Sequence, residues 1–220
     1  MAPRATDPYH ISDIDPLRDA ATLGAVTSTE ALAPKTRRWT RVEYERLVEC
    51  GVFQPGERLE LLDGLLVVRE PQGSRHAAGI RRAIDTLRRA LGETWQIDSQ
   101  LPVALDDDSE PEPDVAVVPR DAHSYRDAHP SRPVLIVEVA ETSYRIDHTY
   151  KAGLYARAGV PEYWIIDVTR GSLEVHRSPE ASSEAVHGWR YGVVETRRAP
   201  ATITTLAAPD VTIRVADLLP

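Results

Sequence analysis

The sequence predicts an α/β (α+β) fold, and three patterns support this prediction. Two apolar runs flank Asp63-Gly64, a residue pair that favours the tight turn of a β-hairpin. From Ile80 to Leu91, apolar residues recur three or four positions apart, which is the spacing of one helix face. Near-continuous apolar stretches such as PVLIVEVA and EYWIIDV have the length and composition of buried strands.

The folded domain is expected over residues 37–220. Residues 1–36 mix Pro, Ala, Asp and Thr without a sustained period, which predicts a mobile N-terminal extension. Thr40 followed by Glu43 is the signature of a capping box, so a short helix should begin here and end at Gly51.

The central part of the domain contains both kinds of element. Glu60 lies on the first strand of the hairpin, and the helix that follows, SRHAAGIRRAIDTLRRALG, should end at Gly92. WQIDSQLPVAL, PDVAVV and PVLIVEVA predict three strands, of which the first two are joined by the acidic turn DDDSEPE.

The C-terminal part should add one more helix and several strands. A helix is expected over about residues 146–158, because Gly159 follows as a stop signal. EYWIIDV predicts the next strand. Residues 173–220 predict shorter β pieces, with turns at Gly188 and Pro209.

Composition narrows the class of protein. With 220 residues, of which 42% are hydrophobic, the chain can bury one full core. The 26 basic and 34 acidic residues give a net charge of -8, so any contact with nucleic acid must use a local patch. No apolar stretch approaches the roughly 20 residues that span a bilayer, so no membrane is expected as a partner. The single cysteine, Cys50, cannot form an internal disulfide, which favours a cytoplasmic location.

Two carboxylates stand in or next to apolar strands. Glu138 lies inside PVLIVEVA, and burying an unpaired carboxylate costs several kcal/mol, so it needs a partner. Asp114 opens PDVAVV, and if the two strands are adjacent both carboxylates can reach one point. Paired carboxylate oxygens suit Mg²⁺ or Mn²⁺. The alternatives are a turn cap for Asp114 and a satisfied core ion pair for Glu138.

Lys151 is a candidate functional lysine. Only two of the 26 basic residues are lysines, so this chain uses arginine where any surface cation would serve. Asp147, Lys151 and Tyr155 are four residues apart and share one helix face, which places Tyr155 one turn beyond Lys151. The alternative is an ordinary Asp147–Lys151 surface pair, worth only about 0.2–0.5 kcal/mol.

These residues carry a family resemblance. PEPDVAVV and LIVEVAETSYRIDHTYKAGLYARAGVPEYWIID, preceded by LELLDG and by His76 at a helix start, closely resemble the bacterial Uma-two endonuclease family. That family belongs to the PD-(D/E)XK nuclease superfamily, and the resemblance covers about residues 39–218. It implies the restriction-endonuclease-like fold, a mixed central β-sheet flanked by helices, here with an N-terminal β-hairpin and extra C-terminal strands.

The resemblance also implies a divalent-metal phosphodiesterase site. By position, Asp114 and Glu138 would be metal ligands, Lys151 the catalytic lysine and Glu60 a further acidic member. The superfamily places its lysine two residues after the glutamate, where this chain has Ala140. Lys151 can replace it only if its helix packs over the end of the strand and points this face at Glu138.

Basic residues on the second helix predict contact with nucleic acid. A helix N-terminus attracts phosphate, and His76 stands there, so the helix could follow a nucleic-acid backbone. The alternative is a solvated face in an arginine-rich chain. The candidate nucleic-acid-binding residues are His76, Arg81, Arg82, Arg88, their neighbour Arg89, and Tyr155 from the later helix.

Taken together, the sequence predicts a Mg²⁺- or Mn²⁺-dependent endonuclease, a hydrolase whose partner is nucleic acid, with DNA as the preferred substrate. Two alternatives stay open: a catalytically inactive nuclease fold that binds nucleic acid or regulates, and a buried ion-pair network without metal. The sequence leaves open the choice between DNA and RNA, the recognition sequence, the strand preference, the biological target and the oligomeric state, with a homodimer as one option.

Overall fold

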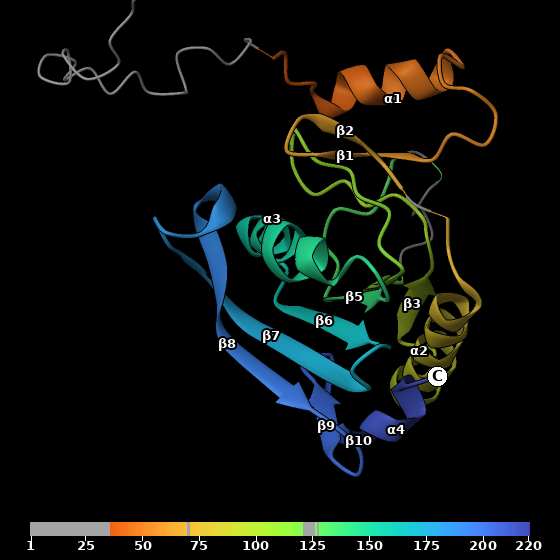
Figure 1. Cartoon of the computed structure of the whole chain (residues 1–220), viewed down its shortest axis with the longest axis vertical. Coiled ribbons are helices and arrows are strands. Elements are labelled where there is room, and N and C mark those ends of the chain that lie inside the picture. The colour runs from red at the N-terminus through yellow and green to blue at the C-terminus, as the bar shows by residue number, and fades with distance from the viewer. Residues whose placement is uncertain (1–35, 70, 121–125, 127) are drawn as a thin grey trace, which may run out of the picture. The chain divides into compact units, whose positions relative to one another are not determined.

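The computed structural model describes residues 36–69, 71–120, 126 and 128–220, and Figure 1 labels the helices and strands of the unit that residues 38–220 form. The predicted extension over residues 1–36 lies outside the described residues, apart from Thr36. The helical elements are α1 (Arg41–Glu49), α2 (Ser74–Leu91), the π-helical turn η2 (Ile146–Lys151), α3 (Ala152–Arg157), the 3-10 turn η3 (Val186–Gly188) and α4 (Val215–Leu218). The strands are β1 (Leu59–Leu62), β2 (Leu65–Val68), β3 (Trp95–Asp98), β4 (Val115–Pro119), β5 (Leu135–Ala140), β6 (Glu162–Asp167), β7 (Ser172–Ala181), β8 (Trp189–Arg197), β9 (Thr202–Thr205) and β10 (Ala208–Arg214).

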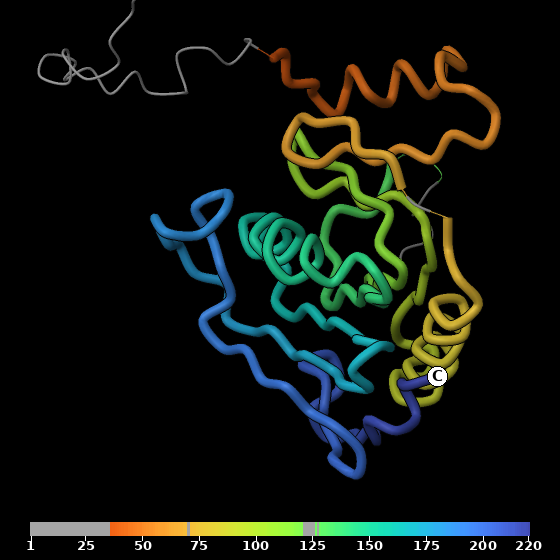
Figure 2. Tube along the Cα trace, viewed as in Figure 1, coloured from red at the N-terminus to blue at the C-terminus, as the bar shows by residue number. Residues whose placement is uncertain are grey.

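A six-stranded sheet, in the order β3-β4-β5-β6-β7-β8, forms the centre of the unit. Strands β5 and β6 run parallel, and the other neighbours are antiparallel. Two hairpins, β1–β2 and β9–β10, stand outside this sheet. Figure 2 shows the chain running from the first hairpin, in orange, to α2, in yellow. The predicted mixed central sheet with flanking helices is therefore confirmed.

The two faces of the sheet bury different side chains, because successive residues of a strand point to opposite faces. Val137 and Val139 of β5 belong to the apolar cluster that α2 completes with Ile80 and Leu87. Ile136 and the other even-numbered positions of β5 face the cluster of α3 instead. Glu138 therefore lies on the α3 face of the sheet.

The local turn and cap signals are confirmed. Thr40 and Glu43 form the predicted capping box at the start of α1. Asp63 and Gly64 both have positive φ angles, of 48° and 75°, as a type I′ hairpin turn requires. The α2 helix ends before Gly92, whose φ of 61° closes it.

Three predictions of detail are wrong. The strand predicted from WQIDSQLPVAL ends at Asp98, because Gln100 has a φ of 54° and turns the chain away. Two of the C-terminal strands are long rather than short, with ten residues in β7 and nine in β8, whereas β9 has the four residues of a short piece. Pro209 lies within β10 and not at a turn. Proline is tolerated there because this two-stranded hairpin has an irregular register between Ala208 and Ile213.

The helix predicted over residues 146–158 forms, but it begins with a π-helical turn. The N–H of Ala152 donates to the carbonyl of Asp147, five residues earlier. Asp147 and Lys151 are buried on one side of this turn, whereas His148 reaches towards Glu174 on β7. The turn therefore contacts two different places on the same sheet face.

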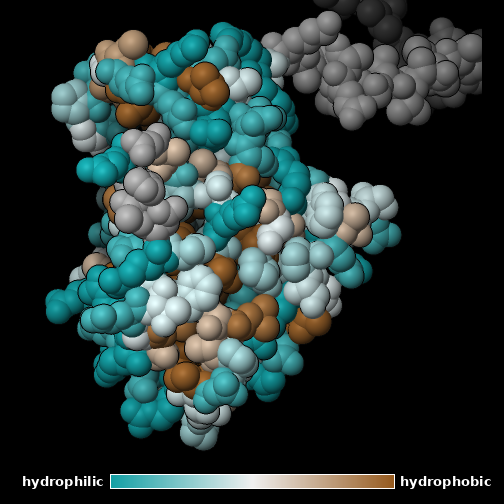
Figure 3. Space-filling model, turned by 180° about the vertical axis from the view of Figure 1, so that it is seen from behind, coloured by the Kyte–Doolittle hydropathy of each residue, from teal (hydrophilic) through white to brown (hydrophobic). Residues whose placement is uncertain are grey.

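The face of the molecule seen in Figure 3 is mainly polar. Figure 3, seen from behind Figure 1, shows hydrophobic side chains scattered among hydrophilic ones. Among the described residues, no helix is both long enough and apolar enough to cross a membrane.

Gly79 fixes how closely α2 approaches β5. A Cβ at this position would lie 2.7 Å from Val139 Cγ1, and Val139 is stiff because it is β-branched. Replacing glycine by alanine in a helix normally gains up to about 1 kcal/mol, but overpacking a core costs typically about 1–3 kcal/mol. We therefore expect Gly79→Ala to lower the melting temperature, measured by thermal unfolding.

The control for this prediction is the double variant Gly79→Ala/Val139→Ala. Because the smaller side chain leaves room for the new methyl group, Gly79→Ala should be neutral or stabilising in the Val139→Ala background. A higher melting temperature for Gly79→Ala alone would contradict the close approach.

Candidate functional site

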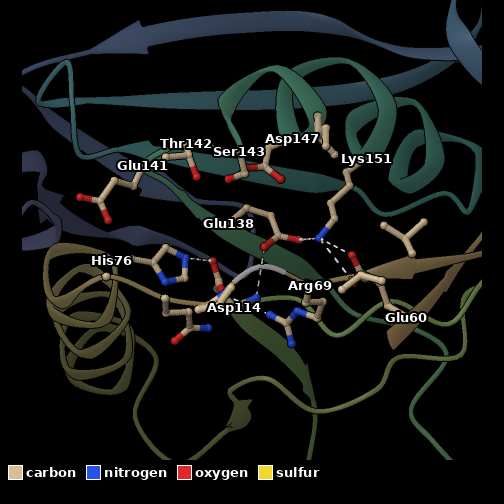
Figure 4. Close-up of a pocket in the computed structure, with 16 residues that line it drawn as sticks. Glu60, Arg69, His76, Asp114, Glu138, Glu141, Thr142, Ser143, Asp147 and Lys151 are labelled. Atoms are coloured by element: carbon tan, nitrogen blue, oxygen red, sulfur yellow. Dashed lines mark hydrogen bonds and ion pairs between the residues drawn. The ribbon is translucent and has the colours of Figure 1, made fainter. Parts of the chain in front are cut away.

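A cleft of about 230 Å³ lies where the β1–β2 hairpin, the starts of α2 and β4, the end of β5 and η2 meet. Figure 4 shows polar side chains from these elements pointing toward one another. Five residues predicted from the sequence line this cleft: Glu60, His76, Asp114, Glu138 and Lys151.

The pairing of β4 with β5 brings Asp114 and Glu138 together. Val115 faces Val137 in this antiparallel pair, so Asp114, one position further out, lies opposite Glu138. The Asp114 N–H donates to Glu138 Oε2 at 3.3 Å, and the Val139 N–H donates to Asp114 Oδ2 at 2.9 Å. The structure thus brings the two carboxylates to one point, while their role as metal ligands stays a prediction.

Lys151 reaches the same point from η2. Its Nζ lies 3.1 Å from Glu138 Oε1 and 3.2 Å from Glu60 Oε1, with 8% of the side chain exposed (Figure 4). The helix therefore directs Lys151 at Glu138. This is the placement that Lys151 needs if it replaces the lysine that the superfamily motif has at the position of Ala140. Ala140 itself is buried at the end of β5.

Glu60 enters the cleft because β1 is tied to the segment that precedes β4. Leu61 exchanges two backbone hydrogen bonds with Glu110, of 2.8 and 3.3 Å. The Glu112 N–H donates to Glu60 Oε2 at 3.2 Å. Because Glu60 then pairs with Lys151, it is placed to position the ammonium group.

Tyr155, on α3, contacts the Glu138 carboxylate. It is fully buried, and its hydroxyl donates to Glu138 Oε1 at 2.8 Å. The expectation that Tyr155 contacts nucleic acid is wrong, because its side chain is inaccessible in the folded chain. Its hydrogen bond instead fixes the orientation of the carboxylate.

His76 and Arg69 contact the two carboxylate oxygens of Asp114. His76 Nε2 lies 2.9 Å from Asp114 Oδ2, and Arg69 Nη2 lies 3.5 Å from Oδ1. Arg69 also donates to Glu112 Oε2 at 2.7 Å. Arg69 was not predicted from the sequence, because one arginine among many carries no signal. Its position directly after the second hairpin strand is the only feature that could have indicated it.

Asp147 adds a fourth carboxyl group to the cleft. It is buried on the face of η2 that it shares with Lys151, as the four-residue spacing predicts. Ser143 Oγ donates to Asp147 Oδ2 at 2.6 Å. The cleft therefore holds more acidic than basic side chains.

Burial and charge shift the pKa values of these groups. Burial raises the pKa of Glu138 to about 8; Lys151 opposes this shift, whereas the nearby carboxylates of Asp114, Asp147 and Glu60 add to it. Burial alone would also raise the pKa of Asp114, but the hydrogen bond and charge of His76 hold it below the usual value. The pKa of Lys151 is raised, since Glu138 and the other carboxylates outweigh its burial. Of the cleft carboxyls, Glu138 is therefore the one whose ionisation the burial and the neighbouring carboxylates oppose most strongly.

These shifts predict a pH dependence for the metal-free protein. A carboxyl whose folded pKa is above its unfolded pKa binds a proton more tightly when folded, so its ionisation destabilises the fold. The pKa of His76 is raised as well, although burial alone would lower it, because of its hydrogen bond with Asp114. Its contribution to stability is also lost as the pH rises. The melting temperature in a chelator should therefore fall between about pH 5 and pH 8.

For each group, the slope of the free energy of unfolding against pH is at most about 1.4 kcal/mol per pH unit. Glu138→Gln should flatten it, because the variant has no proton to lose at this position. Thermal unfolding at several pH values in EDTA measures both proteins. A wild-type melting temperature that rises over this range would contradict the raised pKa of Glu138.

The arginines of α2 lead away from the cleft. Arg82 Nη1 donates to the Ala216 carbonyl at 3.5 Å, and Arg89 donates to Thr86 Oγ1 at 3.1 Å. At about 1.5 Å per residue, the stripe extends roughly 20 Å along the helix from His76 to Arg89. Contact with nucleic acid stays a prediction for this stripe, whose exposed members are Arg81, Arg82, Arg88 and Arg89.

The mixed sheet flanked by helices, with an acidic cleft beside β5, defines a protein of the restriction-endonuclease-like fold class. Within that class, the Uma2 family model, described as "Putative restriction endonuclease", matches residues 41–216. The chain therefore belongs to the Uma2 family, which confirms the resemblance and supports a nuclease acting on nucleic acid.

A solved structure has the same fold. It is a "putative nuclease belonging to DUF820" from Anabaena variabilis, with a TM-score of 0.61 and 16% sequence identity. The match covers 81% of this chain and 96% of that one. No curated protein matches the chain.

Proposed function

We propose that this protein is a divalent-metal-dependent endonuclease that hydrolyses phosphodiester bonds in DNA. The observation that carries the proposal is the position of Lys151, whose Nζ lies 3.1 Å from Glu138 although it comes from a different element. A lysine beside two converging carboxylates is the functional set of the superfamily, whose motif places the lysine on the same strand as the glutamate. Family membership supports the same chemistry.

The cleft suits Mg²⁺ or Mn²⁺. Asp114 and Glu138 offer carboxylate oxygens, which these hard cations prefer. The raised pKa of Glu138 reflects first its burial and then the neighbouring carboxylates, and a divalent cation would stabilise the ionised form against both. The hydrogen bond from the Asp114 N–H to Glu138 Oε2 holds these two residues side by side, so we assign the metal to Asp114 and Glu138.

Each residue has a distinct part in the proposed reaction. A bound Mg²⁺ or Mn²⁺ would lower the pKa of water and offset negative charge on the scissile phosphate. Lys151 donates a hydrogen bond to the attacking oxygen or to the phosphate oxygen on which charge develops. Glu60 and Tyr155 hold Lys151 and Glu138 in position, and His76 does the same for Asp114.

A plasmid-nicking assay tests this function. Supercoiled DNA should become nicked or linear in the presence of the protein and Mg²⁺ or Mn²⁺, and EDTA should stop the reaction. Asp114→Asn, purified in parallel, serves as the control for a contaminating nuclease. Equal cleavage by both proteins, or no cleavage with either metal, would overturn the proposal.

A second candidate function is binding of nucleic acid without cleavage. The observation that favours it is that Lys151 and Arg69 already form ion pairs with carboxylates of the cleft. Binding of a fluorescent duplex without nicking would identify this case. The cytoplasmic location and the homodimer stay predictions.

The arginine stripe of α2 gives a test of DNA contact that does not depend on cleavage. If Arg81 and Arg88 contact phosphates, Arg81→Ala/Arg88→Ala should weaken binding and reduce the salt slope by about one unit per lost contact. Fluorescence anisotropy with one duplex at several salt concentrations measures this slope. Arg190→Ala is the matched control, since Arg190 is exposed on β8 and pairs with Glu180. An unchanged salt slope in the double variant would mean that Arg81 and Arg88 do not contact phosphates.

A further inference from the structure

We propose a second metal site, separate from the cleft, in which His148, Glu174 and His176 bind a divalent ion such as Zn²⁺. His148 Nδ1 lies 2.8 Å from Glu174 Oε2, and His176 Nε2 lies 3.3 Å from the same oxygen. The ligand atoms of all three residues lie within 4.8 Å of one another. These separations are close to those of atoms that share one ion at about 2.0–2.2 Å.

The fold builds this site from two elements. Glu174 and His176 are two residues apart on β7, so both side chains point to the same face of the sheet. Glu174 pairs with Ile165, which in turn pairs with Glu138, so Glu174 and Glu138 are two strands apart. At about 4.8 Å per strand, this places the second site roughly 10 Å from the cleft.

The third ligand comes from the π-helical turn η2. His148 lies within this turn and reaches Glu174 on β7, whereas Lys151 reaches Glu138 on β5. Interruptions of this kind occur frequently at functional sites, because the wider turn changes where its side chains point. An ion held by His148 and β7 would therefore fix the turn that positions Lys151.

The chemistry of the ligands favours zinc over magnesium. Two imidazole nitrogens and one carboxylate oxygen are a common ligand set for Zn²⁺, whereas Mg²⁺ prefers oxygen alone. Tyr144 donates its hydroxyl to Glu174 Oε1 at 2.5 Å, which leaves Oε2 for the ion and orients the carboxylate. The His148 side chain is 40% exposed, so water can reach the fourth position, while that of His176 is 3% exposed.

Nearby charges are compatible with a cation. Arg170 lies over the Tyr144 ring, 4.3 Å from its centroid, but it is paired with Asp167 at 2.7 Å. Without a metal, the two histidines must both direct a proton to the same carboxylate oxygen. A single ion replaces both protons and satisfies all three ligands.

Titration with Co²⁺ tests the site in the full chain. The double variant Asp114→Asn/Glu138→Gln removes the two carboxylates to which the cleft metal is assigned, so that binding at that site does not obscure the result. We expect one equivalent of Co²⁺ to produce a visible absorption band, which one equivalent of Zn²⁺ displaces. Zn²⁺ in excess should also raise the melting temperature by several degrees.

Variants of the ligands give the decisive comparison. His148→Gln should weaken Co²⁺ binding at least tenfold, and because His148 is partly exposed this variant should fold. Glu174→Gln should have a similar effect. Tyr144→Phe keeps all three ligands and should bind with little loss. His129→Gln changes the other described cluster of a histidine with carboxylates and should leave binding unchanged.

Two results would overturn the proposal. One is the absence of a visible band and of any Zn²⁺ shift in melting temperature at millimolar metal. The other is binding that His148→Gln and Glu174→Gln leave intact. None of these measurements uses DNA cleavage, so the second site stands or fails independently of the proposed nuclease function.

Discussion

Lys151→Arg is expected to lose nearly all metal-dependent cleavage although it keeps the positive charge. The Lys151 ammonium lies 3.1 Å from Glu138 and 3.2 Å from Glu60 in a buried position. A guanidinium is planar and larger, so it cannot place a donor at the same point. Loss of one well-placed electrostatic donor costs typically about 10²–10³-fold in rate, and we expect a decrease of this size. Single-turnover rates of plasmid nicking measure it.

The matched control is Arg145→Lys, an exchange of the same two residue types at an exposed position just before η2. This variant should cleave at the wild-type rate. Circular dichroism and thermal unfolding show whether Lys151→Arg is folded. If Lys151→Arg cleaved at the wild-type rate and only Lys151→Ala lost activity, Lys151 would contribute only its positive charge.

Millimolar Mn²⁺ is expected to raise the melting temperature of the wild type by several degrees, and Glu138→Gln to abolish this rise. An ion that binds only the folded state adds about 2.7 kcal/mol at one hundred times its Kd. The metal-free Glu138→Gln protein should melt at or above the wild type, because burial and neighbouring carboxylates raise the pKa of Glu138. Differential scanning calorimetry with and without Mn²⁺ measures both effects.

Asp114→Asn gives the opposite expectation and completes the test. Its charge is stabilised by His76 and Arg69, so its removal should lower the metal-free melting temperature while also abolishing the Mn²⁺ shift. If the cleft were an ion-pair network without metal, Glu138→Gln would cost about 3–5 kcal/mol and Mn²⁺ would have no effect. That combination of results would contradict the proposed metal site.

The local parts of the fold were predictable from the sequence. The capping box, the Asp63-Gly64 turn and the Gly92 stop depend on residues within one turn of each other, so short patterns contain the required information. The extent of β3 was not predictable. Its end depends on the positive φ of Gln100 and on a hydrogen bond from Gln100 to Pro113, which joins distant residues.

The same distinction applies to the cleft. Glu138 could be recognised because a carboxylate in an apolar strand needs a partner, and Lys151 because lysine is rare in this chain. The pairing of His76 with Asp114 and the place of Arg69 depend on how the hairpin and α2 pack beside β4, which no local pattern specifies. The burial of Tyr155 likewise depends on the packing of α3 against the sheet.

The position of the lysine has a consequence for how such sites change over time. Ala140 belongs to the buried apolar cluster under α3, so a long side chain at 140 would need the space that this packing fills. Exchange of the helix lysine for a strand lysine would therefore require α3 to repack, and not only the substitution of two residues.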